Sequence, residues 1–421
     1  MIEKKYRIKW NLNFTLIFIF ITIINGILFG NGFNLNSIGS RAASMGGAYI
    51  GLADDYSAVF WNPAGLTQLK GRTLSFYITD AIPSCTWDWD REDPYYPDIH
   101  AKTETRHYLS GLFAYYKPIK RHLTAGIAVY VPSDIGTKWN GYELKNISLD
   151  GIYAEWSSRL KVIAISPVLA YRIDRTLAIG AGLNFYYGTL NLKQVVLYNQ
   201  YSESSSGYGL GFTAGILFTP PDEILSIGLT FKSGYKIRFK GEAESSFLPG
   251  DPESNFSREI PWPMSVGWGV AAKPVDGLTI TTDFQWTNWS VMEVITPNYE
   301  NADWQEEYNI YRREFDIELL WDHTLQVRLG CEYQLKERIA LRGGYYYDDS
   351  PNSGIRLNFL LPSLPHHGIT MGIGWRAGSI QYDFGLEYLM GIKQKLDSPN
   401  LYPGVHGGNT LSSNFSITYR F

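Results

Sequence analysis

The sequence predicts an all-β membrane protein: an antiparallel transmembrane barrel of about fourteen strands, preceded by a partly helical plug. Three observations lead to this fold class. The chain combines 13 Trp, 30 Tyr, 21 Phe and 41 Gly with only 19% charged residues in 421. From Arg72 onward apolar and polar residues alternate with a period of two. Short polar turns alternate with long loops between these segments. Composition by itself leaves a soluble β-sandwich or propeller as the alternative.

The N-terminus has the order of a signal peptide. A basic stretch up to Lys9 is followed by an apolar run from Phe14 to Phe29. This order predicts a signal peptide over residues 1–30, cleaved near Gly30 or Asn31. An uncleaved membrane anchor is the alternative, although the apolar run is slightly short for a span. Removing residues 1–30, which hold four Lys/Arg and one Glu, shifts the net charge from −4 to −7. A mildly acidic exported protein is a poor nucleic-acid binder.

Residues 31–71 differ from the rest of the chain. They are rich in Gly and Ala around 39–48 and then continue as Ala53-Asp54-Asp55-Tyr56-Ser57-Ala58. This composition predicts short helical turns capped by Ser and Asp. A barrel of this width has a lumen larger than its own side chains can fill. We therefore expect residues 31–71 to form a plug and residues 72–421 to form the barrel.

The strands themselves are predicted by strict alternation. In the last segment Phe415, Ile417, Tyr419 and Phe421 alternate with Asn, Ser, Thr and Arg, and the segments 278–286, 325–333 and 369–376 behave in the same way. Apolar residues on one face and small, polar or charged residues on the other are typical of strands between lipid and lumen. Beyond the N-terminal run, no stretch approaches eighteen consecutive apolar residues. A mature membrane protein of this sequence must therefore cross with strands in a closed barrel.

Turns and loops give the strand count. Short turns are predicted near 118–122, 174–176, 220–223, 275–277, 336–338 and 377–379, and longer loops near 81–106, 132–159, 190–206, 241–260, 289–322, 348–366 and 392–410. These connections join about fourteen strands, an even number that closes without an edge. Cys85 falls in a predicted loop and Cys331 in a predicted strand, so we expect both to be unpaired.

Four motifs resemble the FadL/TodX family of outer-membrane transporters for hydrophobic compounds. They are the start Asn31-Gly32-Phe33-Asn34-Leu35-Asn36, the stretch Ala53-Asp54-Asp55 with Phe60-Trp61-Asn62-Pro63-Ala64-Gly65-Leu66, the segment 283–290 (DFQWTNWS) and the segment 341–351 (LRGGYYYDDSP). They occur in the family's order and extend over most of the chain. The resemblance implies a fourteen-stranded barrel with an N-terminal plug in the bacterial outer membrane. It also implies a monomer without cofactor or energy source.

The resemblance further implies passive uptake of hydrophobic molecules such as long-chain fatty acids. The ligand would be captured outside, reach a deeper site near Asn31, Gly32 and Phe33, and leave sideways into the membrane. The membrane partners would be outer-membrane lipid and lipopolysaccharide. The C-terminal Phe421 resembles the signal that the barrel-assembly machinery reads.

Two sites along this path follow from individual residues. The turn Asn62-Pro63-Ala64 would hold the plug, with a purely structural tight turn as the alternative. The segment Leu123–Val131 resembles the family strand whose kink forms the lateral opening. It is followed by Pro132, which cannot donate to a ladder. An ordinary strand end at Pro132 is the alternative.

Basic residues that face the lumen are candidates for holding a ligand carboxylate. Arg328 and Arg342 point inward by alternation, and Lys193 lies nearer the outer loops. Because Glu332 and Asp383 also point inward, an internal salt-bridge lattice is the alternative. The loop around 190–206 is much shorter than in the best-known fatty-acid transporters. The capture groove is therefore expected to be reduced or built differently.

Two other function classes are weighed against transport. A barrel enzyme needs a nucleophile beside a base, and the seven histidines, at 100, 107, 122, 323, 366, 367 and 406, have no such context. We expect no catalytic residue and no metal site. A non-transporting scaffold or surface-binding barrel of the same family is the remaining alternative, because the loops 81–106 and 289–322 are rich in aromatic residues.

Overall fold

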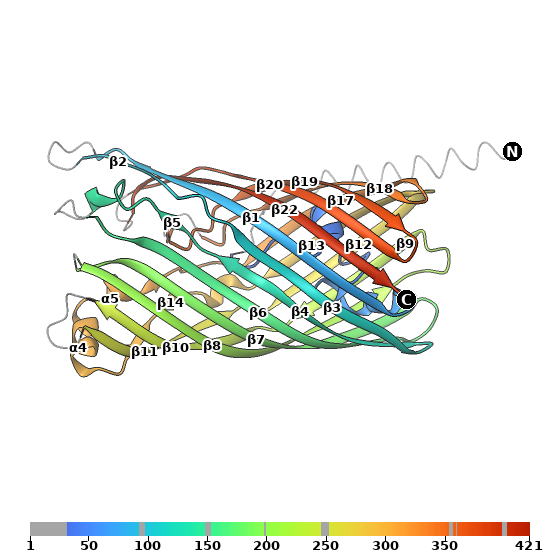
Figure 1. The fold of residues 1–421 in the computed structure, drawn as a ribbon, viewed down its shortest axis with the longest axis horizontal. Helices are drawn as coiled ribbons and strands as arrows, with labels where there is room; N and C mark the ends of the chain where they lie inside the picture. The colour runs from blue at the N-terminus through green and yellow to red at the C-terminus, as the bar shows by residue number, and fades with distance from the viewer. Residues whose placement is uncertain are drawn as a thin grey trace.

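A computed structural model describes residues 32–91, 97–147, 153–197, 199–245, 252–352, 357–358, 360–397 and 402–421. The predicted signal peptide and Asn31 lie outside the described residues. Figure 1 shows an elongated barrel with short helices inside it and the C-terminus at the end that carries the short turns. No helix among the described residues is long and apolar enough to span a membrane.

Fourteen antiparallel strands close into one barrel, as predicted (Figure 1). The first strand pairs with the last along most of its length. Two of the fourteen are interrupted: β9 and β10 are the halves of one strand, and β11 and β12 the halves of the next. The bounds are β1 Thr73–Trp89, β3 Tyr108–Lys120, β4 Leu123–Ile135, β6 Trp156–Arg172, β7 Leu177–Val196, β8 Asn199–Phe218, β9 Leu225–Lys232, β10 Tyr235–Ser245, β11 Glu253–Trp262, β12 Ser265–Val275, β13 Leu278–Thr287, β17 Thr324–Lys336, β18 Ile339–Asp348, β19 His366–Ala377, β20 Ile380–Gly391 and β22 Gly404–Arg420.

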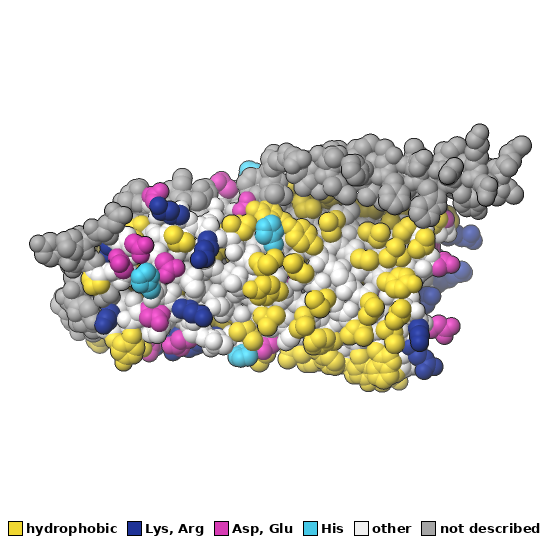
Figure 2. All heavy atoms as spheres, turned by 90° about the horizontal axis from the view of Figure 1, so that it is seen from above, with side chains coloured by type: hydrophobic (Ala, Val, Ile, Leu, Met, Phe, Trp, Pro, Cys, Tyr) yellow, Lys and Arg dark blue, Asp and Glu magenta, His cyan; other side chains and the backbone are white. Residues whose placement is uncertain are grey.

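The outer wall is apolar and the lumen face is small or polar. Leu229, Trp268 and Phe284 lie side by side on β9, β12 and β13 and are all partly exposed, while Thr230 on the other face of β9 is buried. Figure 2 shows hydrophobic side chains over the wall and charged side chains gathered at its two ends. The predicted alternation of lipid-facing and lumen-facing residues is therefore confirmed.

The end with the long connections carries additional small elements. Near these elements a buried ion pair joins Arg258 and Glu203, whose side chains are fully inaccessible and 2.9 Å apart. Arg258 also donates to the carbonyl of Phe315 at 3.4 Å. The elements are β2 Ile99–Lys102, β5 Lys138–Trp139, η2 Lys145–Ile147, η3 Trp289–Val291, β14 Val294–Ile295, β15 Pro297–Tyr299, α4 Ala302–Ile310, α5 Arg312–Phe315, β16 Ile317–Glu318 and β21 Gln394–Leu396.

All six predicted short turns are confirmed, but several predicted loops are wrong: nearly all of 190–206, most of 241–260, and parts of 81–106 and 392–410 belong to strands. The segment 190–206 is a hairpin, because β7 and β8 stay in register from Leu177↔Phe218 to Val196↔Asn199. Residues 81–89 belong to β1, which places Cys85 in a strand; it and Cys331 are unpaired, as predicted. This hairpin includes polar residues such as Ser204 and Ser206. Continuous pairing with a neighbouring strand satisfies the backbone there whatever the side chains are.

The plug lies inside the barrel and consists of α2 Ser40–Ser44, α3 Ala58–Trp61 and the 3-10 helix η1 Pro63–Gln68. The predicted Ser and Asp caps are wrong: α2 and α3 have no side-chain cap, and Asn62 caps η1 by accepting from Ala64 N–H. Tyr49 and Ile50 donate their backbone N–H groups to Asp283 on β13, at 2.6 and 2.7 Å. The plug is therefore hydrogen-bonded directly to the barrel wall.

Candidate ligand path

The first described residues of the plug are clamped by aromatic rings. Phe33 is 1% exposed, and its ring centroid lies 4.6 Å from that of Trp321 and 5.9 Å from that of Trp289. Gly32 has φ +51°, and a Cβ added there would lie 2.6 Å from the Trp289 ring. Glycine is therefore required at this position by both backbone and space. The segment Gly32–Ser37, called the N-terminal segment below, is held at its start by this clamp.

The N-terminal segment also bonds to an irregularity in the barrel wall. The register between β4 and β6 shifts between Tyr130 and Ser133. Within this irregularity the Pro132 carbonyl accepts the Leu35 N–H at 2.9 Å, and Ser133 Oγ donates to Asn34 Oδ1 at 3.3 Å. Since β4 continues to Ile135, the alternative that Pro132 ends the strand is wrong. A backbone N–H group of the plug therefore bonds to a carbonyl of β4 at the point where the pairing between β4 and β6 is interrupted.

Two cavities meet at Asn34 and Leu35, which line both of them. The outer cavity lies toward the long connections; its lining includes Gly32, Ala81, Tyr108, Ile135, Leu364 and Leu389. The inner cavity lies against the plug helix α3; its lining includes Phe60, Tyr130, Pro132, Tyr186, Tyr235 and Trp262. The N-terminal segment is therefore the partition between the two spaces.

The two cavities differ in charge. Within the described part of the chain, the outer cavity is lined by four carboxylates, those of Asp134, Asp348, Asp349 and Glu387, and by no Lys or Arg. The inner cavity is lined by Lys232 and Arg328 and by no carboxylate. This distribution is a property of the assembled barrel, because the residues come from five different strands and the connection after β18.

The basic groups of the inner cavity lie over aromatic rings of the plug. Lys232 Nζ is 3.3 Å from the ring centroid of Phe60, and Arg328 Cζ is 4.9 Å from that of Trp61. Opposite them Tyr186 stacks on Tyr235 at 3.8 Å, and Tyr235 in turn stacks on Trp262 at 5.3 Å between centroids. The inner cavity thus combines flat apolar walls with positive charge.

Asn62 ties the plug to the wall. Its side-chain N–H groups donate to the carbonyls of Ile50 at 3.1 Å and Ile216 at 2.9 Å, while its oxygen caps η1. Pro63 and Ala64 approach β7 so closely that a Cβ on Gly180 would lie 2.4 Å from Ala64 N. This geometry fits both interpretations of the Asn62-Pro63-Ala64 segment. It forms a tight structural turn, and the same residues fasten the plug to the barrel wall.

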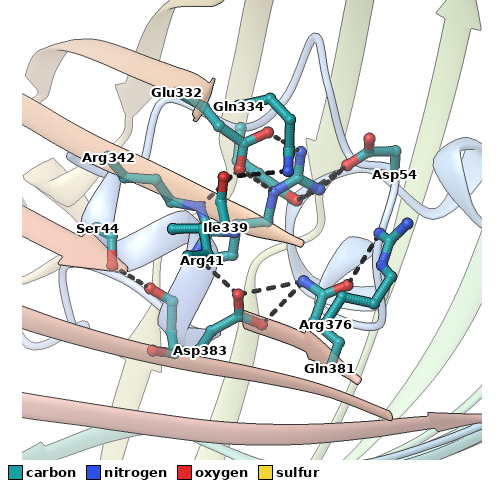
Figure 3. Close-up of polar contacts among 12 residues, drawn as sticks. Arg41, Ser44, Asp54, Glu332, Gln334, Ile339, Arg342, Arg376, Gln381 and Asp383 are labelled. Carbon is teal, nitrogen blue, oxygen red and sulfur yellow. Dashed lines mark hydrogen bonds and ion pairs between the residues drawn. The ribbon is translucent and has the colours of Figure 1, made fainter. Parts of the chain in front are cut away.

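The floor of the lumen is a network of ion pairs between plug and wall (Figure 3). Arg41 contacts Asp54 and Glu332, and Arg342 bridges Glu332 at 2.6 Å and Asp383 at 2.8 Å. Burial by itself lowers the pKa of Arg41, but the carboxylates of Asp54 and Glu332 outweigh it and raise that pKa above its ordinary value. The network closes the lumen below α2 with fixed charge.

The three basic residues predicted to bind a ligand carboxylate lie in three different parts of the barrel. Arg342 lies in the floor network, which matches the alternative of an internal salt-bridge lattice. Lys193 is half-exposed near the long connections and pairs with Glu155 at 2.6 Å. Arg328 lies in the inner cavity, where it bonds to Gln326 and to the Gly47 carbonyl.

Lys232 was missed by reasoning from the sequence. It ends a strand in which Ile227, Leu229 and Phe231 alternate with Gly228 and Thr230. Alternation therefore places Lys232 on the lumen face, and this signal was available. Arg41 was missed for another reason: its partner Glu332 is 291 positions away.

The described fold and cavities define a class: a plugged, fourteen-stranded outer-membrane barrel with aromatic-walled spaces beside its plug. The sequence matches the family described as outer membrane protein transport protein (OMPP1/FadL/TodX) over residues 21–419. The chain therefore belongs to this family of outer-membrane transporters, whose members are not enzymes.

Individual relatives are distant. Outer membrane protein P1 of Haemophilus influenzae is 22% identical over 45% of this chain, and the match covers 40% of that protein. The long-chain fatty acid transport protein of Escherichia coli O6:H1 is 22% identical over 89% of this chain and 90% of its own. Two solved structures share the fold at a TM-score of 0.75, covering 93% of this chain and all of theirs: a Pseudomonas aeruginosa FadL homologue, 17% identical, and the Pseudomonas putida toluene transporter TodX, 15% identical.

Proposed function

We propose that this protein takes up hydrophobic molecules, long-chain fatty acids or compounds like them, by passive diffusion through its barrel wall. The observation that carries the proposal is the shared partition at Asn34 and Leu35. This segment separates two partly apolar cavities and bonds to the wall irregularity at Pro132. A movement of the N-terminal segment would join the two cavities. It would also break the hydrogen bond from Leu35 N–H to the Pro132 carbonyl and so uncover the irregularity in the wall.

A sideways exit is favoured over a route straight through the barrel. The floor beneath the plug is lined by ion-paired Arg41, Glu332, Arg342 and Asp383. An alkyl chain that left an apolar site for water around these charged groups would lose about 0.8 kcal/mol per CH₂. A path from the inner cavity past Pro132 into the lipid would instead lead the chain along the aromatic walls formed by Tyr186, Tyr235 and Trp262.

The relatives' names agree with this class of ligand. One relative is named a long-chain fatty acid transport protein, and one structural neighbour is a toluene transporter. The aromatic walls of the inner cavity would suit either an alkyl chain or an aromatic ring.

Uptake in cells tests the proposal. Labelled long-chain fatty acid would be offered to cells that carry the protein, lack it, or carry it without residues 31–33. We expect uptake to require the protein and to fall on deletion, because Phe33 can no longer position the N-terminal segment. Equal amounts of folded protein at the surface are the control. Uptake that does not depend on the protein would exclude fatty acids as its ligand.

A further inference from the structure

The outside of the barrel changes from apolar to polar along β7 and β8. On β8 the outward side chains of Leu210 and Tyr208 are 62% and 77% exposed, and the next outward residue is Ser206. The ring centroid of Tyr208 lies 5.2 Å from that of Tyr187 on β7. Because tyrosine is enriched where hydrocarbon meets polar head groups, these two rings mark the outer edge of the apolar wall.

An open hollow, called the outer-face hollow below, lies on the outside of the barrel just beyond this edge. It has a volume of about 720 Å³ and extends over the neighbouring strands β7, β8, β10 and β11 (Figure 1). Its hydroxyl and amide side chains are those of Thr189, Asn191, Ser204, Ser205, Ser206, Asn255, Ser257 and Asn298. Such groups both donate and accept hydrogen bonds, as the hydroxyl groups of a sugar do.

Two cations lie at the membrane side of the outer-face hollow. Arg238 and Lys240 alternate with buried residues on β10 and therefore point outward, and Lys240 is level with Ser206 of β8. Arg238 donates to Ser257 Oγ at 3.4 Å. Among the described residues, no carboxylate oxygen lies within 4.0 Å of either cation, whereas the neighbouring Lys236 is paired with Glu259 at 2.7 Å.

The carboxylates of the outer-face hollow lie farther from the membrane. Glu242 is the next outward residue after Lys240 on β10, about 7 Å along the strand toward the long connections. Glu300 is at the same level, because its N–H donates to the carbonyl of Asn255, which pairs with Glu242. Charge is therefore ordered by height, with cations beside the apolar wall and carboxylates above them.

We propose that the outer-face hollow binds a phosphorylated glycolipid of the outer leaflet, of the lipopolysaccharide type. In such a lipid the phosphates lie where the acyl chains join the sugars. The acyl chains lie along Leu210 and Tyr208, a phosphate lies between Arg238 and Lys240, and the sugars lie against the hydroxyl and amide groups. Arginine suits this role, because its guanidinium group can donate two parallel hydrogen bonds to one phosphate.

This site is separate from the proposed ligand path. None of the residues that line the outer-face hollow lines the outer or the inner cavity. The inference therefore goes beyond the transport function and does not depend on it. A phospholipid would satisfy the two cations but would leave the row of hydroxyl and amide groups without a sugar.

Glycolipid binding to the purified protein in detergent tests the site. The probes are a lipopolysaccharide with a short sugar core and the same glycolipid after enzymatic removal of its phosphates. We expect the wild type to bind the phosphorylated form about tenfold more tightly, because the dephosphorylated form loses its charge-assisted hydrogen bonds. Arg238→Gln combined with Lys240→Gln should abolish this preference, whereas Arg238→Lys combined with Lys240→Arg should retain most of it.

Lys120→Gln combined with Arg121→Gln is the matched control. It removes the same two charges from exposed positions at the short turn between β3 and β4, at the other end of the barrel. It should bind both probes like the wild type. A wild type that does not distinguish the probes, or a folded Arg238/Lys240 double Gln variant that still does, would overturn the inference. Phosphatidylglycerol bound as tightly as the glycolipid would overturn the assignment to a sugar-bearing lipid.

Discussion

At the scale of single residues, the path depends on a few side chains whose surroundings are unusual. Gly32 and Phe33 are fixed by Trp289 and Trp321, and Lys232 lies over Phe60. The motif around Phe33 was recognised in the sequence, because residues 31–36 resemble the N-terminal residues of FadL/TodX family members. Its contacts with Trp289 and Trp321 were not predicted, because these residues lie more than 250 positions away, at the two ends of the predicted loop 289–322, and the motif 283–290 that contains Trp289 does not indicate what its ring meets.

Phe33→Ala tests the clamp. Removing a buried Phe side chain costs about 3–5 kcal/mol where the surroundings cannot collapse. Because the N-terminal segment is held at this point, we expect the loss to appear as faster hydrogen exchange at residues 34–37 and as reduced fatty-acid uptake. Phe76→Ala, which removes a lipid-facing ring on β1, is the control. Unchanged exchange in the Phe33 variant would show that other contacts hold the segment.

At the scale of elements, the plug and the wall are one hydrogen-bonded unit. Backbone N–H groups of the plug bond to Asp283 on β13, and the side chain of Arg41 on α2 bonds to Glu332 on β17. Strand periodicity predicted that Glu332 faces the lumen. It could not predict which plug residue meets it, because that depends on how the 31–71 segment folds inside the closed barrel.

Glu332→Gln tests the floor network. The substitution leaves Arg41 and Arg342 with one fewer counter-charge in a buried position, and breaking such a pair costs roughly 3–5 kcal/mol. We expect a lower thermal unfolding temperature in detergent and increased leakage of small polar solutes through the barrel. Lys236→Gln, which breaks an exposed pair, should cost at most about 1 kcal/mol. Equal effects of the two substitutions would mean that the network does not secure the plug.

At the scale of the whole molecule, partly exposed apolar side chains form a belt on the outer wall, while the lumen face carries small, polar or ion-paired residues. Figure 2 shows this belt on one face, with charged side chains toward its two ends. Leu229 on β9 lies in this belt between Ile216 and Trp268. The lumen-facing charge of Arg342 has carboxylate partners, but a charge on the belt would face hydrocarbon.

Leu229→Arg tests this placement. We expect it to lower the free energy of unfolding in lipid bilayers by about 2 kcal/mol, because arginine on the lipid face is costly at membrane depth. Leu229→Ala should cost less, since it removes apolar area without adding charge. Denaturant titration in vesicles measures both. An arginine variant as stable as the alanine variant would place this row outside the hydrocarbon.

The sequence by itself determined the alternation, the short turns, the strand number and the family. These depend on local periodicity and on turn residues, which neighbours in the chain specify. Tertiary structure decided the rest: the length of the β7–β8 hairpin, the partners of Arg342, and the separation of charge between the two cavities. The reason is physical. A lumen-facing side chain meets residues from strands that are distant in sequence, and only closure of the barrel around its plug brings these together.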